Sequence, residues 1–215
     1  MTSIDLLGLV EWQVPNTEKM EKGKCYYQIC KTTVAKGVGT HTFILLYDNI
    51  EGVWYEFRGG PSSRDNFGSI SASDGDQEGL GTLLGTFDVL GGKHSCEHPS
   101  TSGQIPQCTL VEIPNCMGNS RKINQCFRTV IQKINSLGVV YKPVPSGIAN
   151  ITSSRLNGNC NTLSSLLQDV CVGKDKTVWQ RPGFSQPGDK ELTFYYQKLL
   201  AAIKNGFPRE LLPQE

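Results

Sequence analysis

The chain has 215 residues, of which 38% are hydrophobic and 8% aromatic. This apolar content can bury one sizeable core, and it excludes a disordered or collagen-like polymer. Lysine and arginine total 21 against 20 aspartate and glutamate, so the formal charge of +1 gives no general reason to bind nucleic acid or an anionic membrane. No stretch reaches the roughly 20 apolar residues of a membrane span, and Met1 to Trp12 lacks the basic start and apolar core of a secretory signal. We therefore expect one soluble catalytic or binding domain over residues 1–215.

Three strands are predicted in the first part of the chain. Lys24 to Val34, Thr40 to Tyr47 and Val53 to Arg58 are rich in β-branched, apolar and aromatic residues, a composition typical of strands. A turn at Asp48 to Gly52 would join the second and third in an antiparallel hairpin. Gly59 to Pro61 should end the third strand sharply.

The next segment, from Ser62 to about Asn119, is rich in glycine, serine, proline and cysteine. It holds two short strand candidates, at Thr82 to Leu90 and at Cys108 to Ile113. A structureless loop of this length is uncommon inside a compact domain. We therefore expect an irregular but ordered insertion at about 62–119 that covers one face of the sheet.

Three helices are predicted in the second half of the chain, where apolar residues recur at intervals of three and four. They lie at Ser120 to Leu137, Asn159 to Val172 and Glu191 to Lys204. Asn119 or Ser120 can cap the first helix, and Gly138 can end it. A short strand follows at Val139 to Val144. The predicted fold class is α+β, with a small antiparallel sheet packed on helices.

Eight cysteines raise the question of a disulfide framework. Cys126 and Cys171 fall on apolar helical stripes and are interpreted as buried thiols. Cys25 and Cys30 lie in an extended run, roughly 16 Å apart, too far for a mutual bridge. One pair is plausible among the remaining Cys96, Cys108 and Cys116. The redox compartment stays open.

The position of Cys160 suggests that it is a catalytic nucleophile. Asn159 is a good N-cap, so Cys160 lies in the first turn of the following helix, and its sulfur projects toward the same side as Leu167 and Cys171. The free N–H groups and positive dipole at a helix N-terminus stabilise a thiolate, which is the nucleophilic form. The same N–H groups, flanked by Asn159 and Asn161, can hold the oxyanion that forms when a thiolate attacks an acyl carbon.

His41 is the preferred base among the three histidines of the sequence, the other two being His94 and His98. It opens a strongly apolar strand, where an imidazole needs a partner. Such a histidine usually needs a third group to fix its tautomer, and Glu56 on the next strand is a candidate. A register shift of one residue would place Tyr55 on that face instead.

These segments resemble a known superfamily. GTHTFILLYDN, then VWYEFRGGPSS, and later NGNCNTLSSLL look like the circularly permuted papain-like proteins, in which a strand-opening histidine precedes the nucleophilic cysteine. Two branches are similar, the PPPDE-type isopeptidases and the permuted NlpC-like cell-wall peptidases with related bacterial effector toxins. The resemblance covers Thr40 to Pro61 and Ser154 to Val172. It implies His41 as base, Cys160 as nucleophile, and Glu56 or another polar group as third member.

The resemblance implies hydrolysis of an amide, peptide or isopeptide bond without a cofactor or metal. Peptidoglycan stem peptides, cut by a bacterial cell-wall-degrading effector, are the first expectation for the substrate. A compact domain without a wall-binding repeat fits delivery by another machine, so a delivery or immunity protein is an expected partner, and the periplasm an expected place of action. An isopeptidase acting on protein-modifier conjugates is the alternative. The absence of a histidine soon after Cys160 argues against the lecithin:retinol acyltransferase-like branch.

Two other hypotheses compete with the hydrolase. Suitable zinc ligands occur in the middle of the chain, without the paired C-x-x-C spacing that makes zinc sites recognisable; they are His94, Cys96, His98, Cys108 and Cys116. The chain would then be a silent, zinc-stabilised binding module. The glycines before Ser62 and Ser63 lack the Lys-Ser or Lys-Thr and the helix of a phosphate loop, so a turn is the better interpretation.

Overall fold

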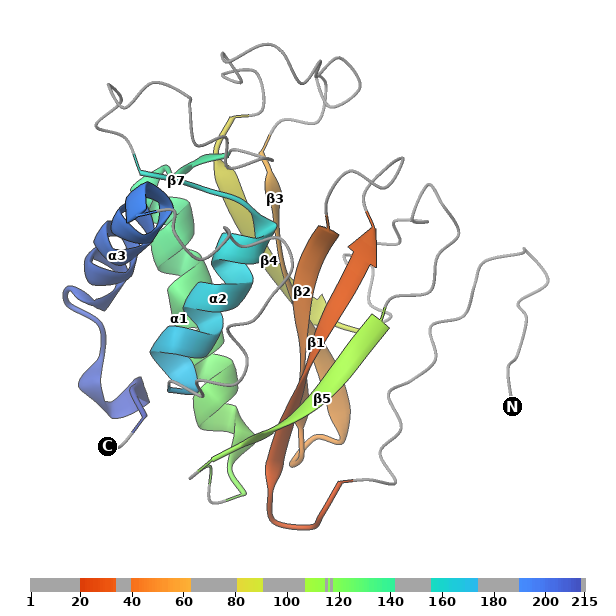
Figure 1. The fold of residues 1–215 in the computed structure, drawn as a ribbon. Helices are drawn as coiled ribbons and strands as arrows, with labels where there is room; N and C mark the ends of the chain where they lie inside the picture. Colours follow the sequence, from red (N-terminus) through yellow and green to blue (C-terminus); the bar gives the residue numbers. More distant parts are fainter. Residues whose placement is uncertain are drawn as a thin grey trace.

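A five-stranded antiparallel sheet with helices on one face forms the architecture of the protein (Figure 1). The computed structural model describes residues 20–33, 40–62, 81–90, 107–114, 116, 118–141, 156–173 and 190–213. The strand order is β4-β3-β2-β1-β5, and a second, two-stranded sheet pairs β6 with β7. The strands are β1 (Cys25–Thr33), β2 (Thr40–Asp48), β3 (Val53–Pro61), β4 (Leu83–Val89), β5 (Gln107–Ile113), β6 (Val140–Tyr141) and β7 (Asn157–Gly158). The helices are α1 (Ser120–Leu137), α2 (Cys160–Cys171) and α3 (Lys190–Lys204), followed by a 3₁₀ turn at Arg209–Leu211.

The predicted mixed α and β class and the predicted elements are confirmed, with boundaries that differ by a few residues at most. The helix from Ser120 ends at Leu137, and Gly138 follows it in the left-handed conformation that the stop signal requires. Of the predicted strand from Val139 to Val144, the structure shows Val140–Tyr141 as β6. Residues 142–144 lie outside the described residues. Both strand candidates inside the expected insertion exist, as β4 and β5, and both belong to the main sheet.

The predicted end of the third strand at Arg58 is wrong. β3 continues through Gly59, Gly60 and Pro61 and pairs with β4 along this stretch, with Gly59 opposite Gly85. A Cβ atom on Gly59 would lie 3.0 Å from the Leu163 side chain of α2, and one on Gly85 would lie 3.1 Å from Ile131 of α1. These glycines therefore let two helices approach the sheet closely.

We expect Gly59→Ala to lower the free energy of unfolding by about 1–3 kcal/mol, because the added methyl overpacks the contact with Leu163. Gly60→Ala is the matched control, since a Cβ there meets nothing within 4 Å. Chemical denaturation of both variants and the wild-type protein measures the difference. Equal losses for the two variants would contradict the close-approach explanation.

Two hydrophobic clusters lie on opposite faces of the sheet. The larger one is formed between the sheet and the helices, and it includes Ile44 and Leu46 of β2 together with Phe127 of α1. The smaller one lies on the other face and is formed by Cys30, Phe43, Leu45 and Trp54. Since successive strand residues point to opposite faces, the even-numbered residues from Thr42 to Leu46 face the helices.

The sheet opens between β2 and β3. These strands pair from Asp48↔Val53 to Ile44↔Phe57, but beyond that point β2 continues along β1 and β3 continues along β4. Helix α2 contacts both strands. Its Leu163 packs against Gly59 of β3, and its Ser164 donates a hydrogen bond to the Thr42 carbonyl of β2 at 3.0 Å. The first turns of α2 therefore lie at this opening.

A disulfide joins Cys126 of α1 to Cys171 at the end of α2, so the prediction of two buried thiols is wrong. Each residue does lie on the apolar stripe of its helix. The two stripes face each other when the helices pack on the sheet, which brings the Cα atoms to 5.8 Å, within the usual range for a bridge.

Two further disulfides tie strand β1 to later segments. Cys30 pairs with Cys108, its register partner on β5, and Cys25 pairs with Cys116. The prediction that Cys25 and Cys30 do not bridge each other is confirmed. The predicted disulfide among Cys96, Cys108 and Cys116 does not join Cys108 to Cys116. The pairing of β1 with β5 brings each of these two to a cysteine of β1 instead.

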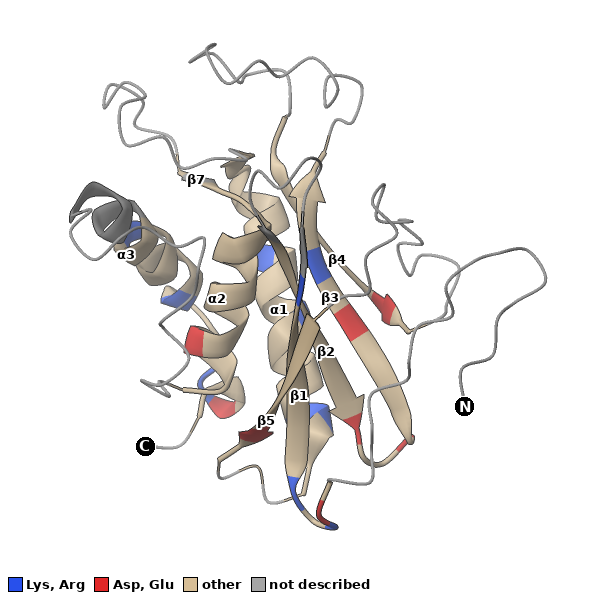
Figure 2. Cartoon of the chain, turned by 45° about the vertical axis from the view of Figure 1, so that its right-hand side comes forward, with Lys and Arg blue, Asp and Glu red and all other residues tan. Residues whose placement is uncertain are grey.

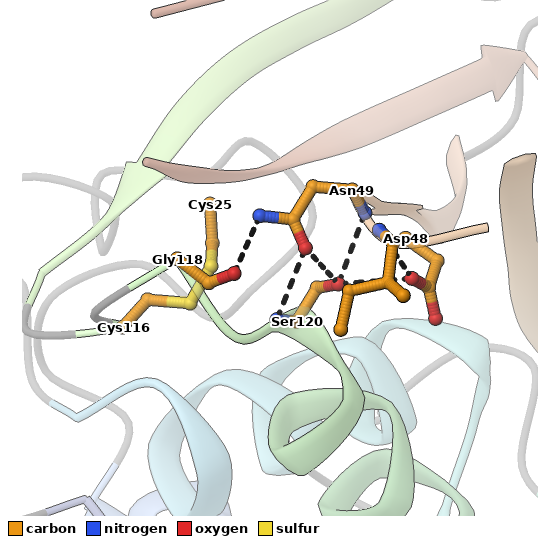
Figure 3. Close-up of a disulfide and its surroundings, with 7 residues drawn as sticks. Cys25, Asp48, Asn49, Cys116, Gly118 and Ser120 are labelled. Carbon is orange, nitrogen blue, oxygen red and sulfur yellow. Dashed lines mark hydrogen bonds between the residues drawn. A yellow bond between two sulfur atoms is a disulfide. The ribbon is translucent and has the colours of Figure 1, made fainter. Parts of the chain in front are cut away.

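The start of α1 is anchored beside the Cys25–Cys116 disulfide, as Figure 3 shows. Asn119 is the N-cap residue but makes no side-chain cap hydrogen bond. The Asn49 side chain instead donates to the Gly118 carbonyl at 2.7 Å, and its amide oxygen accepts from the Ser120 hydroxyl at 2.7 Å. The Asn49 amide oxygen also accepts from the Ser120 N–H at 3.4 Å, so the turn between β2 and β3 satisfies one of the free N–H groups at the start of α1.

Candidate active site

Cys160 is the first residue of α2 and is 6% exposed. Asn159 has extended backbone geometry, its side chain accepts from the Thr162 N–H at 3.1 Å, and the Thr162 hydroxyl accepts from the Asn159 N–H at 3.1 Å. This reciprocal capping box confirms Asn159 as the predicted cap. Within the described part of the chain, Cys160 is the cysteine that forms no disulfide.

The Cys160 sulfur lies within a set of hydrogen-bond donors. The backbone N–H groups of Thr42, Asn161 and Cys160 itself point at it, and so does the Tyr141 hydroxyl. The thiol itself donates to the Asn161 side-chain oxygen, 3.7 Å from the sulfur, and this bond favours the protonated form. The three N–H groups and the Tyr141 hydroxyl favour a thiolate, and in the reaction they are available to an oxyanion.

Burial nevertheless raises the pKa of the Cys160 thiol above its ordinary value, and the hydrogen bonds from Thr42, Asn161, Cys160 and Tyr141 offset this rise only in part. The resting thiol is therefore protonated at neutral pH. The sequence pattern shows the helix N-terminus, which favours a thiolate, but it does not show how completely the site is desolvated.

The sulfur meets the sheet at the backbone edge of β2. A backbone N–H of a strand lies in the plane of the sheet, and the Thr42 N–H is directed at Cys160. The Thr42 carbonyl accepts from Ser164 of the same helix. N–H and C=O of one strand residue leave on the same side, so this side of Thr42 faces the opening and not β1. The candidate site therefore lies where β3 has left β2.

His41 lies directly before Thr42, and the structure brings its backbone to the predicted nucleophile. The peptide whose N–H meets the sulfur joins His41 to Thr42, so standard bond lengths place the His41 Cα within about 6 Å of the sulfur. The imidazole leaves β2 on the face opposite the helices, with its ring centroid 6.2 Å from that of Phe43. A contact between ring and sulfur must therefore pass around the edge of β2.

The predicted role of Glu56 does not fit the register. Glu56 pairs with Leu45, four residues and about 13 Å along β2 from His41, too far for its carboxylate to bond the His41 ring directly. Glu56 is 3% exposed and forms an ion pair with Arg58, whose guanidinium stacks on the Phe43 ring at 4.1 Å. Charged residues are sparse on the described ribbon (Figure 2), and Glu56 and Arg58 are buried, as are Asp48 and Asp169.

The alternative third residue, Tyr55, lies on the helix face and not beside the sulfur. Its register partner is Leu46, and its hydroxyl donates to Glu51 at 2.7 Å. That contact belongs to the turn at the far end of β2 and β3 from Thr42. Neither residue that the sequence proposes as third member is therefore placed to orient His41.

Tyr141 is the site residue that the sequence reasoning missed. It lies on β6, is 4% exposed, and pairs in parallel with Gly158, two residues before Cys160. Burial raises the pKa of the Tyr141 hydroxyl, and its contact with the Cys160 sulfur adds to the rise. The chain segments of β6 and β7 are separated by residues 142–156, and no local pattern links them. A tyrosine in the short predicted strand, two residues before Pro143, was the available signal.

Tyr141→Phe should slow alkylation of Cys160 at pH 8 by about tenfold or more, because a hydrogen bond to a charged group is worth about 1.5–3 kcal/mol. The rate falls because the Tyr141 hydroxyl stabilises the thiolate. Loss of this donor raises the pKa of the Cys160 thiol further, so less thiolate is present at a given pH. Iodoacetamide labelling, located by peptide mass spectrometry across a pH series, measures the effect. An unchanged pH profile would show that the hydroxyl does not stabilise the thiolate.

The zinc hypothesis loses two of its ligands, since Cys108 and Cys116 are held in disulfides. His94, Cys96 and His98 lie outside the described residues. In the part of the chain that the structure covers, no three histidine, cysteine or acidic residues gather in a way that could hold a metal ion. No helix within the described ranges is long and apolar enough to cross a membrane.

Comparison with family models, curated proteins and solved structures gives no match for this chain.

Proposed function

We propose that the protein is a cysteine hydrolase that cleaves amide or peptide bonds, with Cys160 as nucleophile and His41 as base. One observation carries the proposal: the sulfur of a cysteine outside any disulfide, at the start of a helix, meets the peptide that joins His41 to Thr42. The order, with histidine before cysteine, is that of the permuted papain-like proteins that the sequence resembles.

In the proposed reaction, the His41 ring reaches around the edge of β2 and takes the proton of the Cys160 thiol when a substrate carbonyl enters the opening between β2 and β3. The sulfur attacks the carbonyl carbon, and the oxyanion accepts hydrogen bonds from the N–H of Cys160 and the hydroxyl of Tyr141. His41 then protonates the leaving amine, and water hydrolyses the thioester. The raised pKa of the resting thiol means that this dyad needs the base for every turnover.

For the substrate we propose peptidoglycan stem peptides, and for the protein the role of a bacterial effector that acts in the periplasm. Three disulfides support an oxidising compartment. Delivery by another machine and inhibition by an immunity protein belong to the same proposal. No cofactor enters the reaction.

A catalytically silent binding module is the second candidate, and the burial of Cys160 favours it. Desolvation raises the pKa of the thiol, as it does for structural cysteines that do not react. The two candidates differ in one measurable property. In the hydrolase, selective alkylation of Cys160 depends on His41, whereas in the module the thiol is inert with or without the imidazole.

The deciding experiment is digestion of purified peptidoglycan with the wild-type protein and with Cys160→Ala, followed by mass spectrometry of the fragments. We expect new amino termini within the stem peptides with the wild-type protein alone. Cleavage of modifier conjugates in place of peptidoglycan would make the protein an isopeptidase. If the wild-type protein cleaves neither peptidoglycan nor modifier conjugates and its Cys160 thiol is inert, the silent module is supported.

A further inference from the structure

A stripe of buried polar residues runs along α2 from Cys160. Cys160, Ser164 and Gln168 follow one another at intervals of four, so they lie on one face of the helix. All three are buried, and Ser164 is 1% exposed. Serine and glutamine are rarely placed in such an apolar interface unless each polar atom has a partner.

Ser164 finds its partner on β2. Its hydroxyl donates to the Thr42 carbonyl at 3.0 Å, at the point where β2 has lost its pairing with β3. The N–H of Thr42 is directed at the Cys160 sulfur. The two polar groups on the open side of Thr42 are therefore both satisfied by α2, one by Ser164 and the other by Cys160, one helical turn apart.

Gln168, one turn further along α2, adds two hydrogen bonds that hold this arrangement in place. Its side-chain amide donates to the Ser164 carbonyl at 2.7 Å, and its amide oxygen accepts from the Tyr27 hydroxyl of β1 at 3.3 Å. The helix is thus connected by hydrogen bonds to β1 and to β2. The position of its first turn relative to Thr42 is set by these bonds as well as by the apolar packing.

We propose that Ser164 is a positioning residue for the nucleophile: by holding the Thr42 carbonyl, it keeps the Thr42 N–H aimed at the Cys160 sulfur. The inference rests on the proposed function only in naming Cys160 the nucleophile. Thiol reactivity can be measured whether or not a substrate is known.

The physical reason is that β2 around Thr42 is held by β1 on one side and only by α2 on the other. Without the Ser164 hydroxyl, the Thr42 carbonyl is left buried without this donor, and this edge of β2 can shift away from the first turn of α2. The N–H then spends less time on the sulfur. Since this N–H favours the thiolate, its loss makes Cys160 less reactive at a given pH.

The test compares Ser164→Ala with Ser165→Ala, a matched control on the next residue, which is 3% exposed. The rate of iodoacetamide alkylation at Cys160 is measured across a pH series by peptide mass spectrometry, with thermal melting recorded in parallel. We expect Ser164→Ala to slow alkylation by about twofold to tenfold, the factor that corresponds to one neutral hydrogen bond, and to move the pH profile upward. Ser165→Ala should keep the wild-type profile. Identical profiles for the two folded variants would overturn the inference.

A second pair of variants covers the case in which Ser164→Ala does not fold. Ser164→Thr keeps the hydroxyl, whereas Ser164→Val has the same shape without it. Alkylation near the wild-type rate in the first and a slower rate in the second would support the positioning role, and equal rates would refute it. Peptidoglycan digestion by the wild-type protein is scored separately, so failure of the hydrolase proposal is distinguishable from failure of this one.

Discussion

Replacing Cys160 by alanine should lower kcat/KM for the proposed hydrolysis by at least about ten-thousandfold, because the reaction then loses the atom that forms the acyl-enzyme. Cys160 is largely buried and packs beside the β2 backbone, so the variant should fold with its sheet and helices intact. Initial rates of fragment release from the substrate measure the effect, and circular dichroism provides the folding control.

His41→Ala is the companion variant, and it should be impaired to a similar degree. Residues that act as one unit in catalysis show strongly non-additive effects, so the double variant should be no worse than either single variant. A His41→Ala protein that keeps the wild-type rate would remove His41 from the mechanism. In that case the imidazole on the outer face of β2 serves the packing around Phe43 instead.

Local periodicity was sufficient to predict the helices and most strands. The helix from Ser120 to Leu137 and the start of α2 at Cys160 agree with prediction, because an amphipathic stripe, a cap and a stop residue are properties of neighbouring residues. The same logic misplaced the end of β3. A glycine pair indicates a turn by local statistics, yet Gly59 is needed here because Leu163 of α2 packs on its Cα.

The site was predictable only where it depends on local sequence. Cys160 and its cap could be found, since both lie at one helix start. Tyr141 could not, because it reaches the sulfur through the pairing of β6 with β7. The place of Glu56 in an apolar strand indicates a buried partner, but strand register, which is a tertiary property, pairs it with Leu45 and not with His41. Its ion-pair partner Arg58 is two residues along the same strand and on the same face.

Loss of the Cys126–Cys171 disulfide should have the largest effect on stability. The bond joins α1 to the last residue of α2 across a sequence separation of 45, and opening a loop of that size adds conformational entropy to the unfolded chain. We expect Cys126→Ala/Cys171→Ala to lose about 3–5 kcal/mol of unfolding free energy. The loss is large because most domains have only about 5–15 kcal/mol in total.

The two single variants separate the cross-link from ordinary packing. Each one already breaks the bond, so each should lose most of what the double variant loses, and the three free energies should be far from additive. Denaturant unfolding at constant pH, under oxidising conditions that keep the Cys25–Cys116 and Cys30–Cys108 bonds closed, measures all three. Additive losses of about 1 kcal/mol per cysteine would mean that the helices are held by packing alone. In that event the position of Cys160 would depend on the sheet contacts of α2, and not on its covalent tie to α1.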